Sequence, residues 1–540
     1  MDKMDKALIS ACYENREDQV KQLLSNPKVD PNCQSRIGKT PFMIACEEGH
    51  VEVAEILLND QRVDVNRIDD AGWTPLNSAC GNGHIEVVEL LLTDERIDIN
   101  RVSHKRGQKQ REKEEQDEIF FGEFGVFEGV VDVDEKESIN DSLNQVNDKG
   151  DDDDSETAFY IACKFEQIDV MKLLLKDKRI NTTQTRNDCW ASFFLACYDG
   201  EIESVKLLLN NERIDVNKAN TVGATPFYMA CENGHIEVVK LLLDDERIDV
   251  NKENNFCSPF YMACENRHME IVELLLKDKR VNLNTGESYH GVTPFYSACR
   301  RGDIQLMNVL LNNERIDVNK PNYFGATPFH IACKNGDIEV VKLLLNDERI
   351  ERNEVDNDNR TPFYQVCWNG HIEIVKLLLN DKKTDIRLAN NSNWTPFYVA
   401  CHCKHIEVIK LLLNDERVDI NKPIPDGSTP LIHASYFTKV EIIEYILASG
   451  REVNLTAIDI NGNTAIGIAQ EGAKEQKRNW EDEEVFKERN LACSNIVNLL
   501  ESFQTNPFET RMKLRRHIGY SVFFFFFFLY YFFLFPSKKK

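Results

Sequence analysis

The stretch "TPFYMACENGHIEVVKLLLDDERIDVNK", residues 225–252, decides the fold. Thr225 is a residue type that caps helices, Pro226 suits a first helical position, and Gly234 suits a left-handed helix end. Residues 236–243 follow with apolar side chains nearly all round, as expected of a helix that lies between two neighbours. The stretch therefore predicts two short helices and an extended connector with a turn.

Close copies of this stretch recur along the chain. Its cysteine returns at intervals of 33 to 35 residues, with one interval of 83. It stands at Cys12, Cys46, Cys80, Cys163, Cys197, Cys231, Cys264, Cys299, Cys333, Cys367 and Cys401, and Ser435 and Gln470 take its place in two more copies. Thirteen repeats result, the first without the Thr-Pro start. Such a period predicts stacked repeats that each contact their neighbours.

The repeat resembles the ankyrin repeat, with its TPLHxA start, Gly-His hinge, leucine-rich second helix and DVN connector. The resemblance extends from about Ala7 to Phe503. It implies an all-α solenoid of helix-turn-helix repeats joined by extended, β-hairpin-like connectors, which we assign to residues 1–503. The fourth residue of TPLH is mostly aromatic here, and His330 alone keeps the imidazole. We therefore expect most repeats to lose the imidazole's hydrogen bonds to neighbouring turns.

Cys231 and His235 stand four residues apart and raise the question of a metal or catalytic pair. In other repeats Arg, Gln, Glu or Asp replaces the histidine, and the glycine before it breaks the helix. We interpret the cysteine as a buried apolar residue and the histidine as a hinge residue. In "CHCKH" (401–405), His402 and Cys403 alone are additions to the repeat. Motifs of nucleotide-binding, metalloprotease and serine-hydrolase sites are missing from the sequence. We therefore predict a protein that is not an enzyme, without catalytic, cofactor or metal residues.

The body of the chain is acidic. The 540 residues carry a net charge of −25, and residues 511–540 hold seven Lys or Arg and no acid, so the preceding residues carry about −32. Such a charge repels phosphate and argues against nucleic-acid partners. The start "MDKMDKALIS" predicts no signal peptide, and sixteen cysteines without one favour a reducing, cytoplasmic compartment. We expect a monomer.

Two insertions interrupt the repeats. The first, 101–150, falls in a connector and runs from basic through the apolar "IFFGEFGVFEGVV" (119–131) to acidic. It is interpreted either as a low-complexity loop or as a peptide that docks on a partner or on the repeats themselves. The second, 471–490, is charged and displaces the last second helix to 494–503. Terminal repeats are often atypical because they cap the stack.

The C-terminal residues belong to no repeat. Residues 504–517 are interpreted as a basic linker, 518–535 as a hydrophobic Phe-rich segment and 536–540 as a basic tail. The hydrophobic segment reaches the short end of the length that spans a membrane, and the basic flanks would leave the repeats in the cytoplasm. Three interpretations stay open: a membrane tail anchor, an artefact of the gene model, and a soluble apolar tail.

Ankyrin repeats imply a protein–protein interaction scaffold with unidentified protein partners. Two alternatives are a soluble cytosolic adaptor with an artefactual tail and a membrane receptor or channel subunit, although one short segment makes a pore only by oligomerising. An enzyme site within the first insertion is disfavoured by its small size. Connector tips and the pair after the repeat cysteine vary between repeats, and aromatics and Arg are common interface anchors. The candidate partner-binding residues are Trp73, Trp190, Phe256, Tyr289, Arg300, Arg301, Phe324, Trp368 and Trp394.

Overall fold

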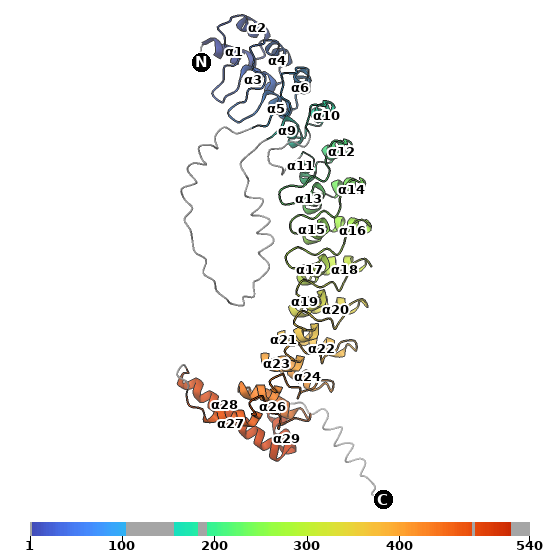
Figure 1. The fold of residues 1–540 in the computed structure, drawn as a ribbon, viewed down its shortest axis with the longest axis vertical. Coiled ribbons are helices and arrows are strands. Elements are labelled where there is room, and N and C mark those ends of the chain that lie inside the picture. The colour runs from blue at the N-terminus through green and yellow to red at the C-terminus, as the bar shows by residue number, and fades with distance from the viewer. Residues whose placement is uncertain (1–2, 104–155, 182–191, 478–480, 520–540) are drawn as a thin grey trace. The chain divides into compact units, whose positions relative to one another are not determined.

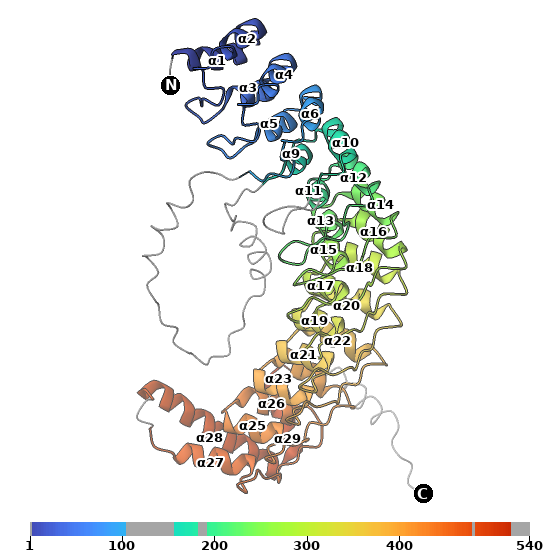
Figure 2. The ribbon, with the colours of Figure 1, turned by 45° about the horizontal axis from the view of Figure 1, so that its top comes forward.

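Each repeat folds as a pair of helices in the computed structural model (Figures 1 and 2). The structure describes residues 3–103, 156–181, 192–477 and 481–519, and within these ranges it contains helices and turns but no strand. The chain divides into an N-terminal unit, Met1–Val281, and a C-terminal unit, Asn282–Lys540. The described helices make seven pairs in the first unit and six in the second. The predicted all-α architecture of thirteen repeats is confirmed.

The odd-numbered helix of each pair is the first helix of its repeat, and the even-numbered helix is the second. In the N-terminal unit the helices are α1 (Lys3–Tyr13), α2 (Glu17–Leu24), α3 (Pro41–Glu48), α4 (Val51–Leu58), α5 (Pro75–Gly81), α6 (Ile85–Leu92), α9 (Ala158–Lys164), α10 (Ile168–Lys176), α11 (Ser192–Asp199), α12 (Ile202–Leu209), α13 (Pro226–Asn233), α14 (Ile236–Leu243), α15 (Pro259–Glu265) and α16 (Met269–Lys277). In the C-terminal unit they are α17 (Pro294–Arg301), α18 (Ile304–Leu311), α19 (Pro328–Asn335), α20 (Ile338–Leu345), α21 (Pro362–Asn369), α22 (Ile372–Asn380), α23 (Pro396–Cys403), α24 (Ile406–Leu413), α25 (Pro430–Tyr436), α26 (Val440–Ala448), α27 (Ala465–Lys474), α28 (Glu483–Thr505) and α29 (Pro507–His517).

Local sequence sets the bounds of the first helix. The Thr225 hydroxyl accepts a hydrogen bond from the Tyr228 amide at 3.1 Å, and Pro226 follows it at the first helical position. Gly234 ends α13 with φ of 80°, in the left-handed region that glycine enters without steric cost. The predicted cap, first residue and end of this helix are confirmed.

Stacking buries the apolar faces between repeats. First helices contact first helices, as α17, α19, α21 and α23 do in turn, and second helices such as α20, α22 and α24 contact each other (Figure 1). Leu344 of α20 and the repeat cysteine Cys333 of α19 are both fully buried. Burying one such leucine contributes about 1.5–3 kcal/mol. The repeat interfaces therefore supply the core.

The Gly-His hinge joins one repeat to the one before it. The His235 Nε2 atom lies 2.8 Å from the Tyr198 carbonyl oxygen of the preceding repeat. A Cβ on Gly200 would lie 2.5 Å from His235 Nδ1, so the glycine leaves room for the imidazole as it lies here. The histidine thus bonds the neighbouring backbone and not Cys231, which supports its interpretation as a hinge residue. Other repeats use His50, His84, His268, His371 and His405 in the same way.

The "DERIDVN" connector contains a backward hydrogen bond that the sequence analysis did not foresee. The Arg349 guanidinium donates at 2.8 Å to the Leu311 carbonyl, at the C-terminal end of α18 in the preceding repeat. Asp347 holds the same guanidinium from two residues away, at 2.6 Å. A cation at the C-terminal end of a helix also interacts favourably with the helix dipole. Equivalent bonds are made by Arg62, Arg96, Arg179, Arg213, Arg247, Arg280 and Arg417.

The asparagine of the same connector bonds forward. Asn319 Nδ2 donates to the Arg349 carbonyl at 2.6 Å, and Asn319 Oδ1 accepts from the Glu351 amide at 2.9 Å. Both partners lie in the next repeat. Arginine and asparagine together therefore tie each connector to both neighbouring repeats, which is a physical reason for "DERIDVN" to recur.

The expected loss of hydrogen bonds at the fourth position of the first helix is wrong for several repeats. His330 bonds the Arg360 carbonyl of the next repeat through Nε2 at 2.9 Å. Where tyrosine replaces this histidine, its hydroxyl reaches the next repeat instead: Tyr364 accepts from Asn390 Nδ2 at 3.3 Å, and Tyr398 pairs with His433 Nδ1 at 3.1 Å. The longer phenol keeps the contact because its oxygen extends beyond the reach of an imidazole.

The last repeat departs from the boundaries expected for it. Helix α28 begins at Glu483, inside the charged insertion 471–490, because the Asp482 side chain accepts the amides of Glu484 and Val485 and caps the helix there. α27 likewise extends into the insertion, to Lys474. Much of the inserted sequence thus lengthens the two helices.

Residues 504–517, expected to be a basic linker, contain α29. This helix contacts α26 and α28, and Leu514 is buried. Arg515 Nε donates to the Ala448 carbonyl at 2.8 Å and Arg511 Nε to the Leu447 carbonyl at 3.3 Å, both at the C-terminal end of α26. The basic residues that suggested a linker therefore satisfy helix-end carbonyls, and α29 covers the end of the stack.

The hydrophobic segment and the first insertion lie mostly outside the described residues. The structure does not describe residues 520–540, which include most of the segment predicted at 518–535. It also does not describe residues 104–155, which include most of the insertion predicted at 101–150. Within the described ranges, no helix combines the length and the apolar character needed to cross a membrane.

Candidate functional site

The ends of α21, α23 and α25 bring six rings together in the C-terminal unit. Trp368 lies in the last turn of α21, Tyr398 and His402 lie on α23, and Trp394 precedes its cap. His433 and Phe437 belong to the end of α25. We call these residues the aromatic-histidine cluster: Trp368, Trp394, Tyr398, His402, His433 and Phe437. They come from three successive repeats, because the repeat period places the same helix end at the same place in the stack.

The two imidazoles occupy the centre of the cluster. His402 lies 4.8 Å from Trp394 and 5.1 Å from His433 between ring centroids, and His433 lies 4.6 Å from Phe437. His402 Nδ1 and His433 Nε2 are 3.1 Å apart, and the Tyr398 hydroxyl reaches the other ring nitrogen of His433. Tyr398, His433 and His402 thus form a hydrogen-bonded chain whose members fix one another's orientation.

Burial keeps these imidazoles neutral at neutral pH. Burial, with His402 and Lys439 nearby, lowers the pKa of His433 to about 4. Burial and Lys439 also lower the pKa of His402. The Lys439 ammonium donates to the His402 carbonyl and, at 3.3 Å, to the Cys401 carbonyl, and lies 5.7 Å from the Phe437 ring centroid. Lys439 therefore places a positive charge beside the cluster, and the Asp426 carboxylate partly opposes its effect on His433.

The cluster has a buried inner part and an exposed rim. His433 is 8% exposed, whereas Trp368 is 40% and Phe437 50% exposed. Tyr436, beside Phe437, is 68% exposed. Large exposed rings held by buried polar contacts can accept the side chains of another protein with little loss of conformational entropy.

The structure brings two of the nine candidate residues into this cluster, Trp368 and Trp394. Arg300 and Arg301 end α17 in the same unit. Tyr289 and Phe324 are exposed at neighbouring connector tips, 62% and 61%, on either side of the His290 ring.

Three candidates lie elsewhere. Trp73 is half-buried, 6.4 Å from the Phe165 ring of the next repeat and against Gly81, so it packs between repeats. Phe256 packs against the buried group that includes Tyr228. Trp190 lies outside the described residues.

Sequence reasoning missed Tyr436, Phe437 and His433. A signal for the first two was available, because Ser435 takes the place of the repeat cysteine and the pair after it is the variable pair. His433 carried no such signal, since its place among the rings depends on the contact between α23 and α25.

Three of the four Cys and His side chains in "CHCKH" have clearly different surroundings. Cys401 is buried in the core, His405 Nε2 bonds the Trp368 carbonyl at 2.8 Å, and His402 bonds His433. Among the described residues, no group of three or more His, Cys, Asp or Glu side chains is arranged to hold a metal ion.

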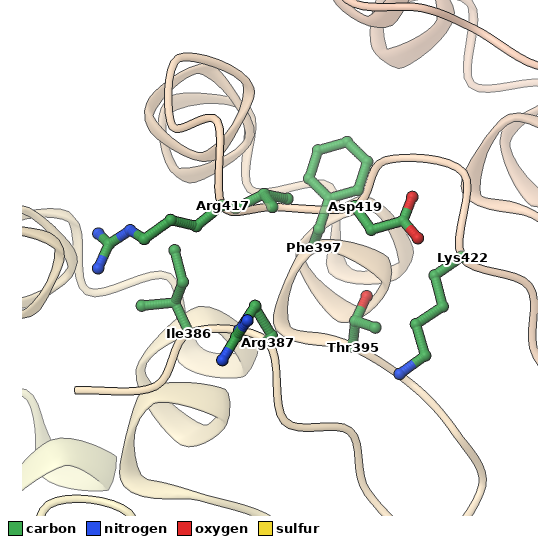
Figure 3. A pocket seen from close by; sticks show the side chains of 8 residues that line it. Ile386, Arg387, Thr395, Phe397, Arg417, Asp419 and Lys422 are labelled. Atoms are coloured by element: carbon green, nitrogen blue, oxygen red, sulfur yellow. The ribbon is translucent and has the colours of Figure 1, made fainter.

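A separate hollow of about 330 Å³ lies between neighbouring connectors of the C-terminal unit. Figure 3 shows Arg387, Arg417 and Lys422 around it. Arg387 is held by Asp385 at 3.0 Å, and Arg417 donates to the Leu379 carbonyl at 2.8 Å. Two of these cations therefore already make connector contacts.

Comparison with known proteins identifies the repeat. The family model described as ankyrin repeats in three copies matches residues 8–103, 161–254, 193–287, 248–322, 295–390 and 382–457, which together exceed half of the chain. No curated protein matches the chain.

Proposed function

The chain belongs to the ankyrin-repeat family, and from that premise we propose that it is a non-catalytic scaffold that binds a partner protein through the aromatic-histidine cluster. The observation that carries the proposal is the aromatic-histidine cluster, which spans three successive repeats and has exposed rings on the first and the third of them. Trp368 and Phe437 expose large apolar areas to water, while a hydrogen bond fixes the neighbouring His402 and His433 rings relative to each other.

Rigid display is the mechanism. The positions of these rings follow from helix stacking, so binding requires little rearrangement of the backbone. Interfaces draw most of their binding energy from a few such anchors, with Trp, Tyr and Arg over-represented. A partner with apolar side chains would cover Trp368, Tyr436 and Phe437 together.

Site-specific photo-crosslinking tests this proposal in cells. A photoreactive phenylalanine derivative replaces Trp368 or Phe437 in the full chain, and Glu373 on α22 provides the control. The Glu373 side chain is 66% exposed but belongs to a second helix. We expect the same covalently linked protein from positions 368 and 437 and not from 373. Equal yields from all three positions would contradict the proposal.

Membrane tethering by residues 518–535 is a further proposal, and it rests on the sequence alone. Mass spectrometry of the native C-terminus tests whether the Phe-rich run exists in the protein. If it does, the full chain should resist alkaline carbonate extraction, whereas a chain ending at Gly519 should be released. Release of both forms would reject the anchor and leave the untethered adaptor.

A further inference from the structure

The first helices α17, α19 and α23 of the C-terminal unit end in or next to basic residues, although the chain as a whole carries −25. In α17 to α23 the three residues after the repeat cysteine include no acid, and the fourth residue is Asp303, Asp337 or a histidine. The basic residues are Arg300, Arg301, Lys334 and Lys404 in those three positions, and Lys439 in the fourth position of the repeat that contains α25. We call these five residues, with the aromatic-histidine cluster, the first-helix face of the C-terminal unit.

Two acids close to this face cap the N-terminal ends of second helices. Asp303 accepts the Leu306 amide at 3.1 Å, and Asp337 accepts the amides of Glu339 and Val340 at 3.1 Å. Their carboxylates cap α18 and α20, where negative charge is favourable.

The charged residues at the corresponding positions of the N-terminal unit are mostly acidic, with Lys164 and Arg267 as the basic exceptions, so the fold does not require a basic face. There the same helix ends carry Glu47, Glu48, Asp199, Glu232 and Glu265. The sign of the charge therefore differs between two units built from the same repeat.

The second helices neutralise their own lysines. Lys342 pairs with Glu339 at 2.7 Å and Lys376 with Glu373 at 2.6 Å, each across one helical turn. Lys439 differs, because in the described part of the chain it donates to backbone carbonyls and forms no salt bridge. Lys439 on the first-helix face thus keeps a positive charge that Lys342 and Lys376 on the second helices do not.

We propose that the first-helix face of the C-terminal unit binds an acidic peptide segment of a partner protein. Apolar side chains of the segment cover Trp368 and Phe437, while its carboxylates lie near Lys334, Lys404 and Lys439. This inference rests on the proposed function and adds the chemical class of the partner. Complementary charge of this kind steers association and selects among partners. A nucleic acid is the less favoured occupant, because a long polyanion would also meet the acidic remainder of the chain, whereas a short acidic segment meets the local positive charge of this face.

Peptide binding to the full chain tests the proposal. The probe is a fluorescein-labelled twelve-residue peptide in which Glu alternates with Phe and Leu, and Gln replaces every Glu in the matched neutral peptide. Fluorescence anisotropy should give binding of the acidic peptide about tenfold tighter than the neutral one at low salt, with the difference shrinking as salt rises.

Matched charge reversals locate the binding. Lys334→Glu with Lys404→Glu should weaken the acidic peptide about tenfold or more, whereas Lys342→Glu with Lys376→Glu on the second helices should change it less than about twofold. The two pairs change the net charge equally, so they separate a local site from a general field. Circular dichroism establishes that both variants are folded.

Four results would overturn the inference. Two concern charge: equal affinity of the chain for both peptides, and equal effects of the two charge reversals. The other two are tighter binding of a single-stranded oligonucleotide than of the acidic peptide, and binding of the peptide only after deletion of residues 104–150. The last would assign the face to the chain's own acidic insertion. If crosslinks from Trp368 persist while charge preference is lacking, the proposed function stands and this inference alone fails.

Discussion

Replacing Arg349 with methionine tests the connector bond that joins the repeats. Methionine keeps most of the apolar stem and removes the guanidinium. The change deletes the bond to the Leu311 carbonyl at 2.8 Å, the weaker bond to the Asn313 carbonyl at 3.3 Å and the pair with Asp347. The Arg349 side chain is 34% exposed, so water partly replaces what is lost.

The expected destabilisation is about 2 kcal/mol. The carbonyl bonds contribute about 1–1.5 kcal/mol, because each is charge-assisted but partly hydrated. The ion pair with Asp347 adds about 0.5 kcal/mol, as for exposed pairs generally. Lys342→Met is the matched control, since it removes a cation that pairs within α20 at a cost of at most about 0.5 kcal/mol.

Native-state hydrogen exchange is the appropriate assay, because long repeat arrays do not unfold in one step. A loss of 2 kcal/mol corresponds to about thirtyfold faster exchange. We expect this acceleration in α18 and α20 for Arg349→Met, with α10 and α12 unchanged. Equal acceleration by both variants, or a loss of protection spread evenly over the chain, would refute the role given to the arginine.

Three further outcomes are expected. The buried repeat cysteines should resist thiol reagents in the native chain, because burial raises the pKa of thiols such as Cys12, to about 12. Cys403 is partly exposed and should react first. Rapid labelling of most cysteines in the native chain would contradict the stacking of the repeats. Acidification from about pH 6.5 to about pH 4 should destabilise the wild type more than His433→Gln. Burial, His402 and Lys439 keep His433 unprotonated in the folded chain, with Asp426 partly opposing them, whereas His433 of the unfolded chain binds a proton in this pH range. Identical melting temperatures of the two proteins across this pH range would reject the prediction. A chain ending at Asn506 should melt below one ending at Gly519, because α29 and its Arg515 bond to α26 are lost; equal melting would return residues 504–517 to the status of a linker.

The sequence was sufficient for the features that each repeat carries within itself. Thr225, Pro226 and Gly234 act on adjacent backbone, so their roles follow from local rules, and thirteen copies of one pattern leave few alternatives. Contacts across repeats were less accessible. The bond from Arg349 to the Leu311 carbonyl spans 38 residues and requires the stacking geometry.

The candidate surface was predicted in part for the same reason. Trp368 follows the repeat cysteine, and this placed it at an exposed helix end from the sequence alone. Trp73 and Trp394 share a position before Thr-Pro, yet Trp73 packs on Phe165 whereas Trp394 packs on His402. The neighbour that each tryptophan meets belongs to another repeat, and no pattern within one repeat specifies it.

Hydrogen exchange of the chain with and without the protein captured through position 368 tests the central claim most directly. We expect slower exchange on binding at the ends of α21, α23 and α25, the helices that carry Trp368, His402 and Phe437, with α20, α22 and α24 unchanged. Protection confined to those second helices, with first helices unaffected, would contradict the claim that the first-helix face of the C-terminal unit binds the partner.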